Sequence, residues 1–181
     1  AYDETDQEIV NTLGANLGYF IGGEHGDELA GELDNKTASG LFSARYKAHT
    51  FYVGLQKVSG DNGWMRVNGT SGGTLANDSL NASFDNPDER SWQARYDYDF
   101  AGLGVPGLSL LARYVSGDDA EIAGSSAKGS EWERDLELKY VVQSGPLKDL
   151  YVRLRNASFR SDFARDADEN RVIVGYSLPI W

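Results

Sequence analysis

The final segment of the chain, 171–181, is the feature that most constrains its fold. Apolar side chains recur there at every second position, and the chain ends on the aromatic Trp181. The alternating apolar residues are Val172, Val174, Tyr176, Leu178 and Ile180, and Ile173 is the exception on the other face. An apolar strand at a frayed terminus is a liability in a water-soluble protein. A transmembrane β-barrel instead uses one face for lipid, the other for its lumen, and the terminal aromatic for the interface. The segment therefore predicts a barrel strand.

The composition agrees with strands and narrows the classes of function. The 181 residues suffice for one domain over 1–181, and we find no apolar run near the 18 residues of a membrane helix. The chain has 21 Gly, 10 Tyr, 7 Phe and 4 Trp, a mixture that favours strands and tight turns. It has no Cys, which excludes disulfides and thiolate metal sites, and its net charge of −11 argues against a nucleic-acid partner. The chain opens at Ala1 without a signal peptide, so we expect a mature form or a piece of something longer.

Period-two alternation predicts about eight strands. The expected strands are 9–20, 33–47, 49–58, 91–100, 108–115, 131–142, 150–159 and 171–181. The segment 91–100 alternates most clearly, with aromatic residues on one face and Asp or Arg on the other. We therefore expect an antiparallel sheet with one apolar face and one charged face.

The expected connections alternate in length. They are short near 48, 101–107 and 143–149, and longer and polar at 22–31, 59–89, 116–130 and 160–168. Short turns at one end of a barrel and long loops at the other are typical of outer-membrane barrels. A lipocalin-like soluble barrel and a soluble sandwich stay open as alternatives, because both alternate too. The run of charges at Glu133, Asp135, Glu137 and Lys139 argues against burying that face in a small dry core.

Several long motifs resemble the OprD family of substrate-specific outer-membrane porins. They are Ser91–Phe100 followed by Gly104–Leu108, Lys139–Leu150, Arg153–Arg155, Asn170–Val174, and the stretches Leu33–Thr37 and His49–Phe51. The resemblance covers most of the chain but is weaker over the first thirty residues. It implies an eighteen-stranded barrel of roughly twice this length, of which this chain is the C-terminal part. An incomplete view of that barrel, a barrel split between two chains, and a small closed eight-stranded barrel are the alternatives, and the first is favoured.

Arginines opposite the apolar face are the candidate substrate path. Guanidinium groups hold carboxylates through paired hydrogen bonds, and a row of weak sites allows conduction. The resemblance implies such a basic ladder, which Arg153, Arg155 and Arg171 match best. The further members on the same face are Arg113, Arg95, Arg45 and Lys47. The alternative is that these charges pair with wall carboxylates; the expected partners are Asp97, Asp99, Glu133, Asp135 and Glu137.

The long 59–89 loop is the second candidate, because the resemblance implies that it folds toward a constriction. Family members often carry an acidic residue near its middle, whereas this chain has Gly72, Gly73 and Thr74 there, with Asp78 a few residues later. Thr74 and Asp78 are thus the constriction candidates, and an exposed surface loop is the alternative. The acidic clusters at 24–28, 118–119 and 166–169 suit solvated loops better than a Ca²⁺ site, and we assign no metal.

The sequence therefore predicts a multi-pass β-barrel of the bacterial outer membrane that passes small carboxylate-containing nutrients by passive diffusion. It carries no catalytic motif, so we expect neither an enzyme nor a cofactor. The expected partners are carboxylate substrates, outer-membrane lipid and lipopolysaccharide, in a monomer or loose trimer. The alternative function is a small closed barrel with a structural, adhesive or ligand-binding role.

Overall fold

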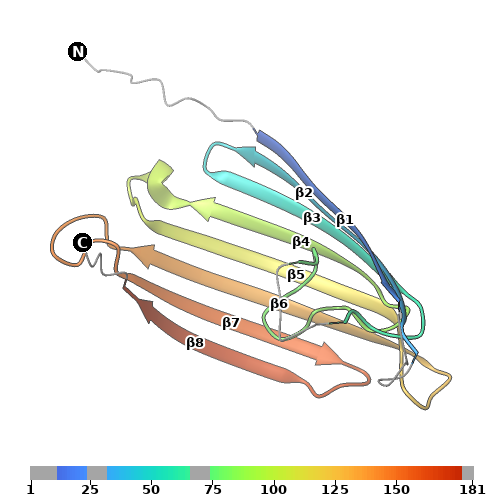
Figure 1. The fold of residues 1–181 in the computed structure, drawn as a ribbon. Coiled ribbons are helices and arrows are strands. Elements are labelled where there is room, and N and C mark those ends of the chain that lie inside the picture. The colour runs from blue at the N-terminus through green and yellow to red at the C-terminus, as the bar shows by residue number, and fades with distance from the viewer. Residues whose placement is uncertain (1–11, 24–31, 66–73, 177–181) are drawn as a thin grey trace.

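Eight antiparallel strands form one curved sheet in which each strand pairs with the next in the sequence (Figure 1). The structure is a computed structural model that describes residues 12–23, 32–65 and 74–176. The strands are β1 (Thr12–Gly23), β2 (Asp34–Tyr46), β3 (His49–Ser59), β4 (Arg90–Asp99), β5 (Leu108–Glu121), β6 (Lys128–Val141), β7 (Tyr151–Ser161) and β8 (Ala167–Gly175). A short 3-10 helix, η1 (Phe100–Leu103), follows β4. The all-β antiparallel prediction is confirmed.

The sheet is open at both edges. In the described residues, no pairing joins β1 to β8, so both strands carry a free edge. Exposed edges invite aggregation unless another strand covers them. A small closed eight-stranded barrel is therefore not what the chain forms. No helix of the described segments is long and apolar enough to cross a membrane.

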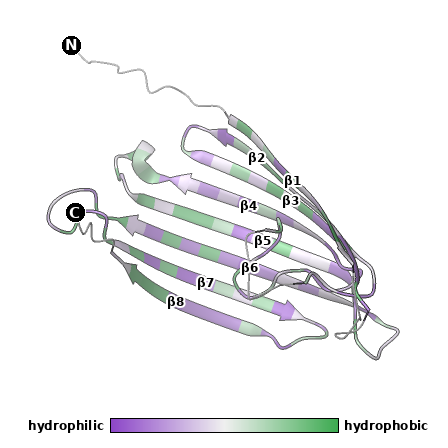
Figure 2. Cartoon of the chain, in the orientation of Figure 1, coloured by the Kyte–Doolittle hydropathy of each residue, from purple (hydrophilic) through white to green (hydrophobic). Residues whose placement is uncertain are grey.

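The outer, convex face of the sheet is apolar and exposed. Leu13, Leu17 and Ile21 of β1 are 86%, 71% and 69% exposed, and Val172 of β8 is 72% exposed. Apolar and polar residues alternate along β6 and β7 in Figure 2, as the strand geometry requires. The apolar residues of this face thus do not pack into a dry centre, which is what a soluble sandwich would need.

The apolar band on this face rises obliquely across the strands. Toward the end of the sheet with the long loops, the first outward polar residue on successive strands is Lys36, Lys57, Arg90, Ser116, Arg134, Asn156 and Asn170. Asn170 of β8 is in register with Ala44 of β2, which lies eight residues after Lys36, the boundary residue of β2. The boundary therefore shifts by about eight residues over six strand spacings. That is roughly 26 Å along the strands for 29 Å across them, a tilt of about 40°. Transmembrane barrels have this tilt.

Aromatic residues mark both ends of the band. Near the loop end, Trp92, Tyr114 and Trp132 lie side by side on β4, β5 and β6, with ring centroids 5.7 and 5.8 Å apart. At the opposite end, Tyr98 contacts both His49 and Phe100 at centroid distances of 4.9 and 4.8 Å. Two such girdles are a property of membrane-embedded barrels.

The predicted strand boundaries need correction at the loop end. The predicted loop 116–130 is wrong over most of its length, because β5 runs on to Glu121 and β6 starts at Lys128. The alternation fails there because a bulge between Gly117 and Ala120, with Asp119 at φ 65°, shifts the register. The last strand likewise begins at Ala167 instead of Arg171, within the predicted loop 160–168. The predicted end of that strand at 177–181, and the start of the first strand before Thr12, lie outside the described residues.

Candidate lumenal site

Between β3 and β4, the segment 74–89 lies across the concave face of the sheet, over β4, β5 and β6 (Figure 1). Its described residues form no strand or helix. The alternative of an exposed surface loop is therefore wrong for residues 74–89. We call this segment the inner loop.

Glu133 of β6 is the main anchor of the inner loop. Its side chain is fully buried, and its carboxylate accepts hydrogen bonds from the main-chain N–H groups of 80–82 at 2.9–3.2 Å. The hydroxyl of Ser79 donates a further bond to Glu133 Oε2 at 2.6 Å. Successive amides that converge on one anion form a nest that compensates for the lost hydration of a buried charge. The sequence suggested Glu133 as an arginine partner, and that prediction is wrong.

Amide side chains of the wall hold the rest of the inner loop. Gln56 of β3 donates to the carbonyl oxygen of Phe84 at 2.7 Å and accepts from the N–H of Asn77 at 3.2 Å. Gln93 of β4 donates to the carbonyl oxygen of Ala76. Asn77, also fully buried, donates to Ser91 at 2.8 Å. Sequence reasoning missed these residues because an amide on the lumenal side of a strand looks like any other solvated polar side chain.

Two arginines of the predicted ladder lie beneath the inner loop. Arg95 forms a bidentate pair with Asp97 at 2.8 and 2.6 Å, and its guanidinium lies 4.6 Å from the Tyr52 ring centroid. Arg113 donates to Asp135 at 2.8 and 2.5 Å and to the carbonyl oxygen of Asp78 at 2.9 Å. Arg113 thus connects the wall to the loop.

A cavity of about 350 Å³ separates the inner loop from the wall. Thr74, Leu75 and Asp78 line it from the loop, and Arg95 and Arg113 line it from β4 and β5. The structure therefore brings both predicted loop residues beside two of the predicted arginines. The Asp78 carboxylate accepts a hydrogen bond from the Ser83 hydroxyl at 2.8 Å.

The arginines of β7 and β8 form a second cluster nearer the turn end. Arg153 and Arg155 share Glu137 of β6, with Arg153 Nε 3.3 Å from Oε1 and Arg155 Nε bound to Oε2. Arg155 lies opposite Arg171 in the register, and Arg171 donates to Glu169 at 2.7 Å. Two guanidiniums therefore share the one carboxylate of Glu137.

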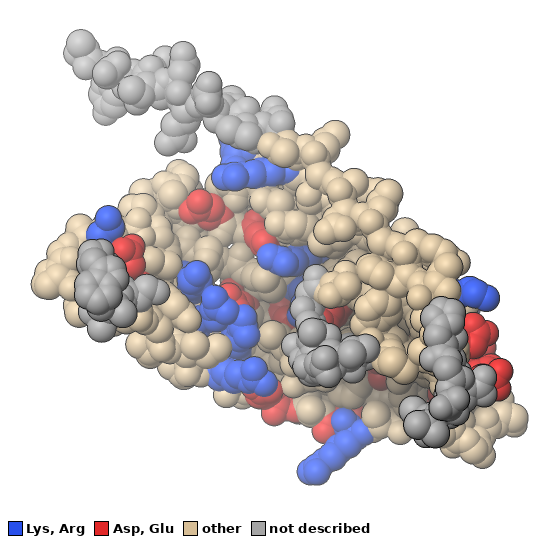
Figure 3. Space-filling view, in the orientation of Figure 1, with Lys and Arg blue, Asp and Glu red and all other residues tan. Residues whose placement is uncertain are grey.

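Lys139 is a lysine that the predicted ladder omitted. It lies opposite Arg153 in the register, and the two cationic groups are 5.2 and 5.5 Å from the Tyr151 ring centroid. The sequence already indicated this position, because Lys139 lies on the charged face of the segment 131–142, opposite its apolar face. Figure 3 shows basic and acidic side chains together in the hollow of the sheet.

Of the other residues predicted for the lumenal face, Arg45 lies there, whereas Lys47 and Asp99 have other positions or roles. Arg45 faces the lumen side from β2, where its Nε donates to the carbonyl oxygen of Lys47 at 3.4 Å. Lys47 is not on a strand; it lies in the turn after β2 with φ 53°, and its ammonium is over the Tyr46 ring. Placing Lys47 in the ladder by parity was therefore wrong, because the alternation stops at Tyr46. Asp99 also has another role, since it caps η1 through the N–H of Ala101 at 2.9 Å.

A pair of buried carboxyl groups lies under the end of the inner loop. Glu89 and Glu131 are 0% and 5% exposed, and Asn86 donates to both, at 2.8 and 3.3 Å. Burial, reinforced by the nearby Asp85, raises the pKa of Glu89 to about 7. Within the part of the chain that the structure describes, no group of three His, Asp or Glu residues is arranged to hold a metal ion. The acidic clusters at Asp119 and Asp168 instead pair with Arg90 and Arg160.

Comparison with known proteins places the chain among porins. Residues 3–180 match the family described as outer membrane porin, OprD family. The porin-like protein GalP of Pseudomonas putida is 54% identical over 170 residues, which are 93% of this chain and 40% of that protein.

Two solved structures from Pseudomonas aeruginosa share the fold. OccK2 (OpdF) in complex with glucuronate superposes with a TM-score of 0.86 at 63% identity, over 90% of this chain and 45% of that one. OpdK with vanillate gives a TM-score of 0.87 at 55% identity, over 92% of this chain and 44% of that one. The chain thus spans less than half the length of the relatives that it matches.

Proposed function

Since this chain belongs to the OprD family of outer membrane porins, we propose that it supplies eight strands of a larger barrel whose lumen passes small carboxylates by passive diffusion. The free edges of β1 and β8 are where the other strands would pair. The end of the sheet with the connections after β1, β3, β5 and β7 would face the cell exterior, and the opposite end the periplasm.

The sharing of Glu137 by Arg153 and Arg155 is the observation that carries the proposal. One carboxylate neutralises one guanidinium, so this part of the wall keeps an excess positive charge, to which Lys139 adds. Guanidinium N–H groups that are not bound to the wall can donate two hydrogen bonds to a substrate carboxylate in bidentate geometry. The partly exposed side chains, 23% and 21% for the two arginines, leave that contact accessible.

The cavity beneath the inner loop would be the narrow part of the path. A carboxylate there meets Arg95 and Arg113, whose charges are largely balanced by Asp97 and Asp135. A balanced pair binds an anion less tightly than an unbalanced one, which suits a site that must release its ligand. OccK2 was solved in complex with glucuronate and OpdK with vanillate, both carboxylates, and this supports the same substrate class here.

The test is single-channel recording from the complete barrel, with the double variant Arg153→Gln/Arg155→Gln. We expect the variant to fold. Its block by glucuronate should weaken roughly tenfold, because two guanidinium groups that bind the substrate carboxylate are removed. The matched control, Lys148→Gln/Arg165→Gln, removes two cations in the connecting segments 142–150 and 162–166. Equal block in both variants would contradict the proposal that Arg153 and Arg155 bind the substrate carboxylate. A folded barrel without conductance would contradict the proposal that the barrel is a channel.

A further inference from the structure

We propose that the outer face of the sheet carries a binding site for the phosphorylated glycolipid of the outer leaflet, lipid A, in a groove between Leu17 and Trp92. The inference rests on the proposed function, because it requires this face to meet the outer membrane. It concerns the opposite side of the wall from the lumenal path.

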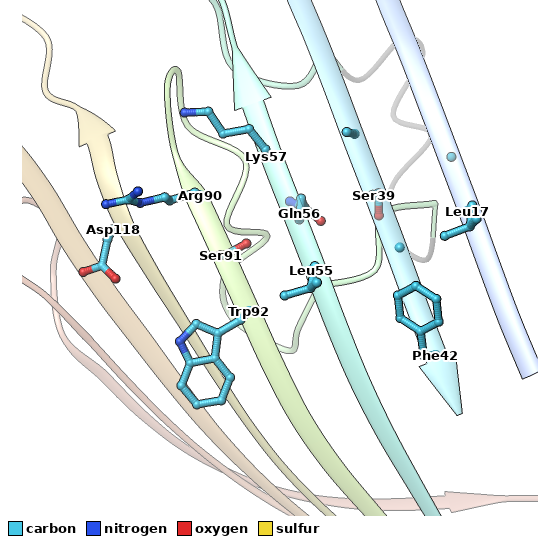
Figure 4. A pocket seen from close by; sticks show the side chains of 13 residues that line it. Leu17, Ser39, Phe42, Leu55, Gln56, Lys57, Arg90, Ser91, Trp92 and Asp118 are labelled. Carbon is cyan, nitrogen blue, oxygen red and sulfur yellow. The ribbon is translucent and has the colours of Figure 1, made fainter. Parts of the chain in front are cut away.

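The groove is a depression of about 610 Å³ that crosses β1 to β4 (Figure 4). Its floor is low because Ala38 and Gly40 of β2 have almost no side chain there. The walls are the large apolar side chains of Leu17, Phe42, Leu55 and Trp92. The space at Gly40 is limited, since a methyl group there would approach Leu17 Cδ2 to 3.1 Å. A flexible acyl chain suits such a narrow, open, apolar channel.

Cationic side chains close the loop end of the groove. Lys57 and Arg90 are cross-strand neighbours on β3 and β4, and Figure 4 shows both at that end, beside Asp118. They are the first outward polar residues above the apolar band, as is Lys36 on β2. A lipid phosphate lies at this depth, directly above its acyl chains.

The existing partners of these cations leave room for a phosphate. Lys57 donates to the neutral main-chain carbonyl of Asp88 at 2.6 Å. Arg90 is 2.8 Å from Asp119, but the two side chains are 67% and 45% exposed. Lys36 is 3.9 Å from Asp34, and these side chains are 54% and 55% exposed. Such exposed pairs contribute little and exchange readily. Asp118 opposes the binding of an anion, so more than one cation is needed.

The distribution of the cations favours lipid A over a phospholipid. Lys36, Lys57 and Arg90 extend over three neighbouring strands, which is roughly 10 Å across the sheet. A headgroup with two phosphates on a disaccharide can contact cations on several strands, whereas a single phosphodiester contacts one or two. The proposed orientation also places this end of the strands in the outer leaflet.

Native mass spectrometry of the complete barrel in detergent, titrated with bisphosphorylated lipid A, tests the site. We expect the double variant Lys57→Gln/Arg90→Gln to lose roughly tenfold or more in affinity. Ala38→Leu, which fills the groove, should lose a similar amount. The matched controls are Lys148→Gln, a cation of the segment 142–150, and Ala112→Leu, an outward alanine of β5 outside the groove. Both should bind lipid A like the unaltered barrel.

Further ligands in the same titration distinguish lipid A from other occupants of the groove. Dephosphorylated lipid A and phosphatidylglycerol should bind the unaltered barrel as weakly as lipid A binds the double variant. Equal binding of phosphatidylglycerol, unchanged binding by either groove variant, or a dimer that lipid A does not displace would each overturn the proposal. Conductance should be the same in all these variants, so failure of the lipid site and failure of the channel give different results.

Discussion

Arg95 of β4 and Arg113 of β5 lie directly opposite each other on the lumenal side of the sheet. Like charges in this position are destabilising. The structure offsets the repulsion with a separate carboxylate for each guanidinium, Asp97 on the same strand and Asp135 on the next. The two guanidiniums are thereby held side by side at the cavity beneath the inner loop.

The two carboxylates should differ strongly in their contribution to stability. Asp135 is 1% exposed and Arg113 13% exposed, whereas Arg95 and Asp97 are 30% and 26% exposed. Asp135→Asn leaves a buried guanidinium without its counter-charge, so we expect a loss of about 3 kcal/mol in the free energy of unfolding. Asp97→Asn should cost under about 1 kcal/mol because water screens that pair. Urea unfolding of the complete barrel measures both, and equal losses would contradict this ranking.

Glu133 should control how firmly the inner loop is held. Glu133→Gln keeps the shape of the side chain but removes the charge on which the amides of 80–82 converge. We expect the loop to detach more often, seen as more frequent current fluctuations at an unchanged number of open channels. Glu121→Gln, an exposed carboxylate at the end of β5, is the control. A quiet Glu133→Gln channel would show that the amide side chains of the wall suffice to hold the loop.

The stability of the fold should fall as the pH rises toward 7, because of Glu89. Burial raises its pKa to about 7 from the ordinary value of 4.5, so the folded state binds the proton more tightly than the unfolded state does. The favourable contribution of that proton is complete below about pH 4.5 and is lost by about pH 7. The groups that face Glu89 are Glu131 and Asp85, both acidic, with Asn86 between the two glutamates.

Glu89→Gln should remove this part of the pH dependence. The measurement is the urea midpoint of the complete barrel between pH 4.5 and pH 8, with Glu121→Gln as the control that keeps the slope. A variant that retains the full slope would assign the titration to another group.

Gly117 should be intolerant of a methyl group. A Cβ atom there would overlap the buried Glu89 carboxylate and lie 2.9 Å from Phe84 Cδ1, so wall and inner loop would have to separate. We expect Gly117→Ala to cost about 2 kcal/mol in the free energy of unfolding. At Gly102, the nearest atom to such a Cβ is 3.4 Å away, and Gly102→Ala should change stability by under about 0.5 kcal/mol. Similar losses in both variants would show that the contacts at Gly117 are not the cause of the loss, because the lower entropy of the unfolded chain makes Gly→Ala stabilising by itself.

Alternation alone was sufficient to assign the two faces of the sheet. Each L-residue on a strand points its side chain opposite to the next, so the sequence alone predicts that Arg153, Arg155 and Arg171 share one face. The same rule failed at Lys47, where a turn ends the strand, and between Gly117 and Ala120, where a bulge adds residues to one strand. Local alternation cannot reveal either event, because both depend on how the partner strand pairs.

What the sequence determined by itself is therefore the class of the molecule: an antiparallel sheet, apolar on one side and charged on the other. The tertiary structure decided which charges meet. Asp97, Asp135 and Glu137 pair with arginines as expected, whereas Glu133, on the same face of the same strand as Asp135, anchors the inner loop. A carboxylate in a strand has the same local pattern in either role. Its partner is set by strand register and by the path of a loop that lies more than fifty positions earlier in the chain.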